Sequence, residues 1–451
     1  MPPRTALLAL LALGCHSRVP VAIAATPEDV PALLDAAAAD DDQAWQRLTH
    51  LCDDIGHRIT GSDALTQAIQ WSVSELKQDG FDSVIAEPVQ AKAWVRGHER
   101  VSVLPDSRPL NVLALGNSAG TPDGPVDVEV VVVTSFDELT ELGDSVAGKA
   151  VLFNVPFTTY GETVGYRVAG PRLAAEQGAA VALVRSISPV SLNTPHTGMT
   201  DFAETAPIPA IALTLEDAEW MHRRQRDGHP ARIRVDLGAH SIGTVDTANV
   251  VAEKRGTEFP DEVVVVGCHL DSWDVGQGAQ DDGAGCVLAW EAARDVVSLG
   301  PSKRTLRLVL YTNEESGLAG GAAYPGAHPN DRHVAAVESD TGAGAATGFR
   351  VHAVNPTTGD ADSERAYRFI TRLNEQQFTA RENYAGADIS PLVKAGTIGF
   401  GVDHDTTNYW PIHHTKADTL EKIDRQDLQD NVRLTAGLLM WLLNADDAHL
   451  E

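Results

Sequence analysis

Three short motifs in the second half of the chain combine one histidine with several carboxylates. They comprise His269 and Asp271, then Asp281, then the adjacent Glu314 and Glu315. Imidazole and carboxylate groups are the usual ligands of catalytic zinc, and one carboxylate can bridge two metal ions about 3.5–4 Å apart. Of two adjacent glutamates, one can bind metal while the other takes a proton from water. These residue types therefore indicate hydrolysis assisted by two metal ions.

The first and third motifs each follow a stretch that is predicted to be a buried β-strand. Residues 263–266 are four consecutive valines, and residues 306–311 form a second apolar run. A helix is predicted between them, because apolar residues recur at helical spacing over residues 287–299. In open α/β sheets, ligands bind beyond the carboxyl ends of the strands. The motifs therefore lie where such a fold places a site, and Asp271 is positioned to accept an N–H from the His269 ring.

These motifs resemble the M28 family of zinc exopeptidases, in its carboxypeptidase Q-like branch. The segments HLDSWD, DDGAG and NEESG occur in the order of that family, and two further family motifs follow downstream. Asp340 in ESDTG resembles the next metal ligand of the family, and His414 in HTKADT resembles the last one. The resemblance runs from about Cys52 to the C-terminus.

The resemblance implies a centre of two zinc ions with five ligands. The implied ligands are His269 and Asp340 on one ion, Glu315 and His414 on the other, and Asp281 as the bridge. Mixed nitrogen and oxygen donors suit catalytic zinc, and manganese or cobalt is chemically compatible with them. The resemblance also implies a cis peptide bond between Asp281 and Asp282. Such bonds between non-proline residues occur at functional sites.

The resemblance implies roles for three further residues. Glu314 is the implied general base, and Asp271 supports the ligands without binding metal. His413 stands where related enzymes place a side-chain donor to the developing oxyanion. Because His413 and His414 are adjacent, either ring is a candidate ligand, and the spacing to the Asp-Thr pair that follows favours His414.

Length and charge narrow the classes of function. The chain has 451 residues, a length typical of two domains. Its formal net charge is −28, which argues against nucleic acid or an anionic membrane as a partner.

The first 25 residues are predicted to be an export leader. Arg4 gives a positive start, and residues 6–14 form an apolar stretch that is too short to span a membrane. Two processing routes are open, namely cleavage after the A-x-A motif at residues 22–24 and a lipoprotein box that ends at Cys15. Either route predicts an exported protein that is periplasmic, extracellular or lipid-anchored.

The cysteines beyond the leader are Cys52, Cys268 and Cys286. Such an odd and sparse set is not a disulfide framework. Cys268 and Cys286 flank the site motifs, so a cysteine ligand is conceivable, but small buried side chains are the simpler interpretation.

Residues 101–241 differ in character from the segments on either side. Short apolar runs recur between glycines and prolines, with one predicted helix at residues 167–177. This pattern predicts a β-rich insert, which resembles the protease-associated domain of carboxypeptidase Q-like enzymes. The predicted fold is therefore α/β, an αβα sandwich with a mostly parallel central sheet. It comprises a leader (1–25), a first catalytic part (26–100), the insert (101–241) and a second catalytic part (242–451).

The function predicted from these observations is a di-zinc exopeptidase that acts on small peptides. The preference for dipeptides comes from the family resemblance alone, and an aminopeptidase on longer peptides is the closest alternative. A glutaminyl cyclase uses one zinc ion, so the five implied ligands disfavour it, and a non-catalytic binding module would not need Glu314. The end of the peptide that is held, the side-chain preference and a homodimeric state stay open.

Overall fold

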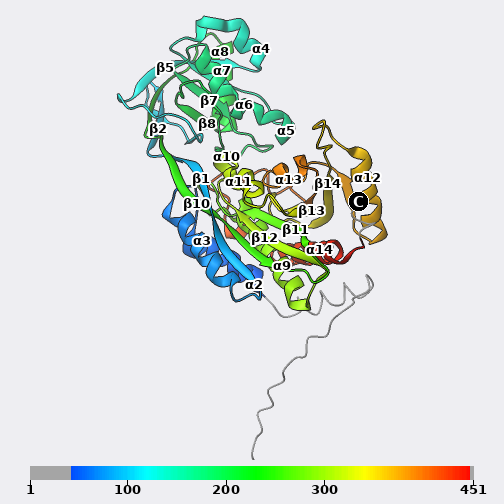
Figure 1. Cartoon of the computed structure of the whole chain (residues 1–451). Coiled ribbons are helices and arrows are strands. Elements are labelled where there is room, and N and C mark those ends of the chain that lie inside the picture. The colour runs from blue at the N-terminus through cyan, green and yellow to red at the C-terminus, as the bar shows by residue number, and fades with distance from the viewer. Residues whose placement is uncertain (1–41, 447–451) are drawn as a thin grey trace, which may run out of the picture.

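The structure, a computed structural model, describes residues 42–446, and two eight-stranded sheets form its framework (Figure 1). The predicted leader, with Cys15, lies outside the described residues. No helix within residues 42–446 is long and apolar enough to cross a membrane.

The first sheet carries the motifs that were singled out in the sequence. Its strands, in spatial order, are β1 (Ser83–Val95), β10 (His240–Lys254), β12 (Arg304–Tyr311), β11 (Phe259–His269), β13 (Arg332–Glu338), β16 (Ile398–His404), β14 (Ala346–His352) and β15 (Ala380–Glu382). The central strands β12, β11, β13 and β16 run parallel to one another. Strand β10 pairs antiparallel with β1 and β12, and β14 pairs antiparallel with β16 but parallel with the edge strand β15. The sheet is therefore mixed with a parallel centre, and the α/β prediction is confirmed.

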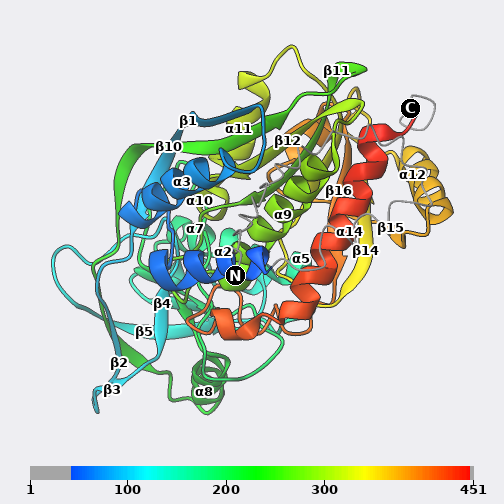
Figure 2. The same cartoon turned by 90° about the horizontal axis from the view of Figure 1, so that it is seen from below.

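Helices cover both faces of this sheet (Figure 2). One face is covered by α2 (Gln43–Thr49), α3 (Asp63–Leu76), α9 (Ala284–Leu299), α12 (Ser363–Glu375) and α14 (Arg425–Asn444), and the other by α11 (Ala319–Ala327) and α13 (Ser390–Lys394). Successive side chains of a strand point to opposite faces. Val264 and Val266 of β11 accordingly pack in the core beneath α9 and α14, whereas Val263 and Val265 pack in the core beneath α11 and α13. Burying each valine contributes roughly 1.5–3 kcal/mol, which explains why the valine run lies at the centre.

The second sheet lies entirely within residues 99–237. Its strands, in spatial order, are β3 (Arg108–Pro109), β2 (Glu99–Leu104), β9 (Arg232–Leu237), β5 (Val126–Val133), β6 (Ala150–Phe153), β7 (Val181–Arg185), β8 (Ala210–Leu213) and β4 (Val112–Ala114). The long antiparallel pair β1 and β10 leads from the first sheet into this region and back again (Figure 1).

This second region contains more helix than its sequence pattern predicted. Between its strands lie α4 (Phe136–Leu142), α5 (Tyr160–Thr163), α6 (Gly165–Val168), α7 (Gly170–Glu176) and α8 (Leu215–Arg226). The one helix predicted at residues 167–177 is two helices, because Pro171 begins a new helix in its first turn. Helix α8 buries only Leu215, Ala218 and Met221, so its apolar stripe is too sparse to stand out in the sequence.

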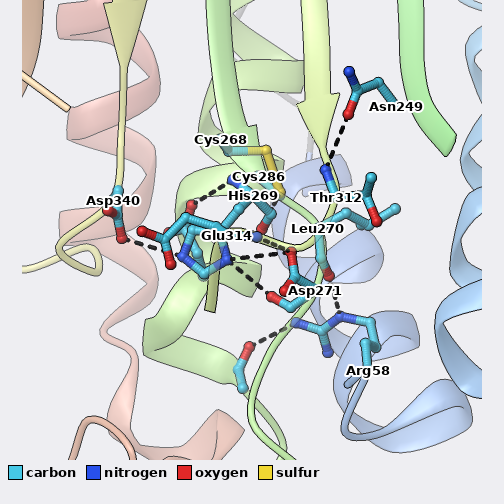
Figure 3. Close-up of a disulfide and its surroundings, with 12 residues drawn as sticks. Arg58, Asn249, Cys268, His269, Leu270, Asp271, Cys286, Thr312, Glu314 and Asp340 are labelled. Carbon is cyan, nitrogen blue, oxygen red and sulfur yellow. Dashed lines mark hydrogen bonds and ion pairs between the residues drawn. A yellow bond between two sulfur atoms is a disulfide. The ribbon is translucent and has the colours of Figure 1, made fainter. Parts of the chain in front are cut away.

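Cys268 and Cys286 form a disulfide (Figure 3), which corrects the prediction of two separate buried side chains. Cys268 lies in β11, and Cys286 lies in the first turn of α9, 18 residues later. Sequence spacing did not reveal the bond, because the intervening loop turns back on itself. Cys52 is free and buried.

We expect the double variant Cys268→Ala/Cys286→Ala to lower the free energy of unfolding by about 3 kcal/mol, the value for closing a loop of this length in the unfolded chain. Denaturant unfolding under oxidising conditions measures this difference, with Cys52→Ala as the matched control. Alkylation of the denatured, unreduced protein should modify Cys52 alone of the three cysteines. Modification of all three would contradict the pairing.

Candidate metal centre

The structure brings the five candidate ligands together at the carboxyl ends of the parallel strands. His269 ends β11, Asp281 lies in η3 (Ala279–Gly283) before α9, Glu315 lies in α10 (Glu314–Gly317) after β12, Asp340 follows β13, and His414 follows β16. Four neighbouring parallel strands therefore each deliver at least one side chain to the same place, as the rule for open α/β sheets predicts.

The distances between these side chains divide the cluster into two donor sets. Nε2 of His269 lies 3.3 Å from Oδ1 of Asp281 and 3.2 Å from Oδ1 of Asp340. Nε2 of His414 lies 3.0 Å from Oδ2 of Asp281 and 3.1 Å from Oε2 of Glu315. The two oxygens of Asp281 therefore face different histidines, with one further carboxylate beside each ring. The peptide bond between Asp281 and Asp282 is cis, as predicted.

The electrostatics of this cluster favour positive charge between the side chains. Although burial alone has the opposite effect, hydrogen bonds from His269 and His414 hold the pKa of Asp281 well below its ordinary value. Burial likewise lowers the pKa of His269, but Asp281 and Asp340 raise it well above the usual range. Oε1 of Glu315 is buried without a hydrogen-bond partner. Two imidazoles and three carboxylates, one with an unused oxygen, fit the donor chemistry of zinc.

Asp271 organises the helix that carries the two glutamates (Figure 3). Its carboxylate accepts the main-chain N–H of Glu314 at 3.0 Å and that of Glu315 at 3.4 Å. Nδ1 of His269 donates instead to the main-chain carbonyl of Asp271, at 2.9 Å, and lies 4.0 Å from the carboxylate. This corrects the expectation that the carboxylate accepts the ring proton, because the main-chain oxygen takes that role.

Comparisons with known proteins agree with this geometry. Residues 249–439 match the model of peptidase family M28. Carboxypeptidase Q of Mus musculus is 38% identical over 393 residues, which cover 86% of this chain and 82% of the relative. The chain belongs to peptidase family M28. Carboxypeptidase Q of Homo sapiens is also 38% identical, over 391 residues with the same coverage. The M28 chain is accordingly a metallopeptidase.

Solved structures show the same fold. A peptidase M28 precursor from Shewanella amazonensis SB2B is 32% identical, with a TM-score of 0.84 and coverage of 93% of this chain and 98% of that one. A zinc aminopeptidase from Bacillus subtilis is 19% identical, with a TM-score of 0.64 and coverage of 89% and 95%. At that identity the second likeness concerns the fold alone.

Glu314 of this M28 peptidase lies beside His269 (Figure 3). Asn313, immediately before it, has φ +64°, a left-handed conformation that asparagine tolerates better than most residues. This turn separates Glu314, which is half-buried, from Glu315, which is buried. Burial raises the pKa of Glu314 well above its ordinary value, and the nearby Asp340 carboxylate raises it further, against the effect of His269.

His413, predicted to be a donor to the oxyanion, lies in a cage of rings. Its ring stacks on Tyr409 and also contacts Tyr160, His196 and Trp410, with centroid distances of 5.0–5.5 Å. Nδ1 lies 3.2 Å from the carbonyl of Trp410, so this nitrogen carries the proton. Burial keeps the pKa of His413 well below its usual value, and Nε2 is buried without a hydrogen-bond partner among the described residues. Donation to an oxyanion would require a proton on Nε2.

Two buried residues that the sequence did not single out hold the loop that carries Asp281. Asp418 accepts main-chain N–H groups of Ala279, Gln280 and Asp281 at 3.1, 2.6 and 3.2 Å. Arg58 donates to the main-chain carbonyls of Leu270, Gln277 and Gly278 at 2.8–3.0 Å. Asp418 belongs to the HTKADT motif, which was a usable signal. Arg58 is an isolated arginine far away in sequence and offered none.

We expect Asp271→Asn to lower kcat by about 10–100-fold with little change in KM, the usual effect of losing a group that orients metal ligands. The two main-chain N–H groups bond to different oxygens of Asp271, and asparagine replaces one of these oxygens with an NH2 group that cannot accept, so α10 should lose its fixed position. Steady-state kinetics on a peptide substrate measures this. The control is Asp331→Asn, which removes a 2.7 Å ion pair with Arg307 before β13, at the opposite end of the sheet. Equal loss of kcat in both variants would contradict the assignment.

Proposed function

We propose that the chain is a di-zinc exopeptidase that hydrolyses small peptides, with dipeptides as the main substrates. The position of Asp281 carries this proposal, because its two oxygens face two different histidines, each with a further carboxylate beside it. Such a carboxylate can serve two ions at once. The curated relatives named carboxypeptidase Q support exopeptidase activity.

In this proposal His269 and Asp340 would hold one zinc ion, Glu315 and His414 would hold the other, and Asp281 would serve both. The two ions, when bound, would polarise the scissile carbonyl and lower the pKa of the attacking water. Neighbouring residues of the protein fix the positions of the proposed ligands. The main-chain carbonyl of Asp271 sets the tautomer of His269, so that Nε2 faces the metal position.

Glu314 is the proposed general base. Its carboxylate takes a proton from the attacking water and delivers that proton to the nitrogen of the leaving amino acid. Asp271 holds the main-chain N–H of Glu314 and so fixes the direction of this carboxylate. His413 offers only an acceptor at Nε2, so we assign it to the wall of the substrate site.

We further propose that residues 101–241 form an inserted domain and that the protein is exported. The second sheet supports the first proposal, because all of its strands lie within residues 99–237. The predicted leader and the disulfide between Cys268 and Cys286 support the second, since structural disulfides persist in oxidising compartments. A lipid anchor at Cys15 and a homodimeric state stay predictions.

Unblocked and blocked dipeptides will distinguish the proposed substrate class from the alternatives. We expect free dipeptides to be cleaved, and N-acetylation or C-terminal amidation to lower kcat/KM by at least about 10²-fold. A site that binds a charged terminus has buried polar groups, and these lose their partners when that terminus is blocked. Cleavage of tetrapeptides as fast as dipeptides, with sensitivity only to N-acetylation, would instead identify an aminopeptidase on longer peptides.

The adjacent glutamates provide a matched pair of variants. Glu314→Gln should retain two zinc ions and lose about 10²–10⁴-fold in kcat, the usual effect of removing a general base. Glu315→Gln should bind one ion more weakly and keep the other. Elemental analysis after dialysis, together with kinetics, tests both variants. Loss of metal from Glu314→Gln alone would reverse the two roles, and full activity of that variant would exclude Glu314 as the base.

A further inference from the structure

The region of the second sheet reaches across to His414 through one residue, Thr197. The main-chain N–H of Thr197 donates to the carbonyl of His414 at 2.9 Å. In return, Nδ1 of His414 lies 3.2 Å from the carbonyl of Thr197. When Nε2 faces a metal, Nδ1 carries the ring proton, so the Thr197 carbonyl is its acceptor. These reciprocal bonds join residues that are 217 positions apart in sequence.

Thr197 is held at each of its polar groups. It is completely buried, and its hydroxyl donates to the carbonyl of Ala114 at 2.8 Å and accepts from Nη2 of Arg96 at 3.3 Å. Its carbonyl also accepts from Nη1 of Arg167 at 3.2 Å. A carbonyl has two lone pairs and can accept from both partners. The residue that contacts His414 is therefore fixed in position before any ligand binds.

Arg167 has an unusual environment for a buried cation. Its side chain is 5% exposed, and within residues 42–446 it forms no ion pair with a carboxylate. Its Nη2 donates to the hydroxyl of Tyr160 at 2.9 Å. Its Nη1, which donates to the Thr197 carbonyl, also lies 3.3 Å from Nδ1 of His414. Gly198 makes room for it, because a Cβ there would lie 2.2 Å from the guanidinium. Burial of an unpaired cation is unfavourable for folding, so a gain elsewhere is needed to explain why Arg167 lies here.

His414 needs such external support. Its φ is +60°, a left-handed conformation that is uncommon for residues other than glycine and persists where the surroundings determine it. The hydrogen bond from the Thr197 N–H to the His414 carbonyl holds the backbone in this conformation. The hydrogen bond from Nδ1 to the Thr197 carbonyl holds the ring. Trp273 packs its edge against the same ring at a centroid distance of 5.8 Å.

We propose that the second-sheet region is a structural part of the metal centre. Thr197 positions the His414 ring, and Arg167 and Arg96 act as positioning residues by fixing Thr197. Figure 1 shows α5 and α6, from which Tyr160 and Arg167 come, on the side of this region that faces the first sheet. This inference rests on the proposed function, because it takes His414 to be a ligand. It predicts that one ion, the one shared by Glu315 and His414, depends on residues far outside the motifs.

Two pairs of variants test the proposal. Thr197→Val keeps the shape of the side chain but removes both bonds of the hydroxyl, whereas Thr197→Ser retains a hydroxyl. Arg167→Met removes the charge, and its control is Arg172→Met on the neighbouring helix, where the side chain forms a surface ion pair with Glu176. The two zinc affinities of each purified full-length protein are measured by competition with a chromogenic chelator. Absorption spectra of the cobalt-substituted proteins report on the geometry of each site.

The expected result is a loss of about 10–100-fold in one zinc affinity for Thr197→Val and Arg167→Met, as for other groups that orient metal ligands. The other zinc affinity of these two variants should equal that of the wild type. Both zinc affinities of the controls Thr197→Ser and Arg172→Met should also equal the wild-type values. A lower melting temperature with both affinities unchanged would mean that Thr197 and Arg167 serve folding alone, and would overturn the proposal. Failure of the wild type to bind two zinc ions would instead overturn the proposed function.

Discussion

The shared position of Asp281 between two imidazoles is the constraint that the rest of the structure serves. A carboxylate that faces two histidines at 3.3 and 3.0 Å must be held in both position and orientation. The protein achieves this with main-chain hydrogen bonds, because main-chain atoms cannot change rotamer. Asp418 accepts three main-chain N–H groups of the loop, and Arg58 donates to main-chain carbonyls at its two ends. Both side chains are almost completely buried, where such bonds are not weakened by competition with water.

The parallel strands explain why so many functional side chains meet in a small volume. Neighbouring parallel strands place their carboxyl ends at one edge, so each strand needs to contribute only one or two residues. Helix α9, which follows the Asp281 loop, is buried along most of its length. The disulfide between Cys268 and Cys286 ties its first turn to β11. The loop that carries Asp271 and Asp281 is therefore closed at both ends.

Much of this centre could be predicted from sequence, and the exceptions share a cause. His269 and Glu315 follow apolar strands directly, so strand prediction placed them at the correct edge. The hydrogen bond between His269 and Asp271 could not be predicted in the same way. The main-chain carbonyl and the carboxylate of Asp271 can both accept the proton on Nδ1 of His269, and residue types do not say which of them does. For His413, the carbonyl of Trp410 decides which nitrogen carries the proton. Thr197 acts through its main chain, which leaves no trace in residue type.

The contact between Thr197 and His414 has a consequence for how the protein assembles. The donors of the centre extend from His269 to His414, and the supporting residues extend back to Arg58. The contacts that complete the site therefore close loops of up to 220 residues, and loops of this size close late in folding. A chain that is still being synthesised, or is truncated, and ends before residue 414 lacks the His414 imidazole even if the strands of its first sheet have already paired. In the proposed centre, the position between Glu315 and His414 would therefore be the last to form, and zinc binding there would report that residues 58–414 have assembled.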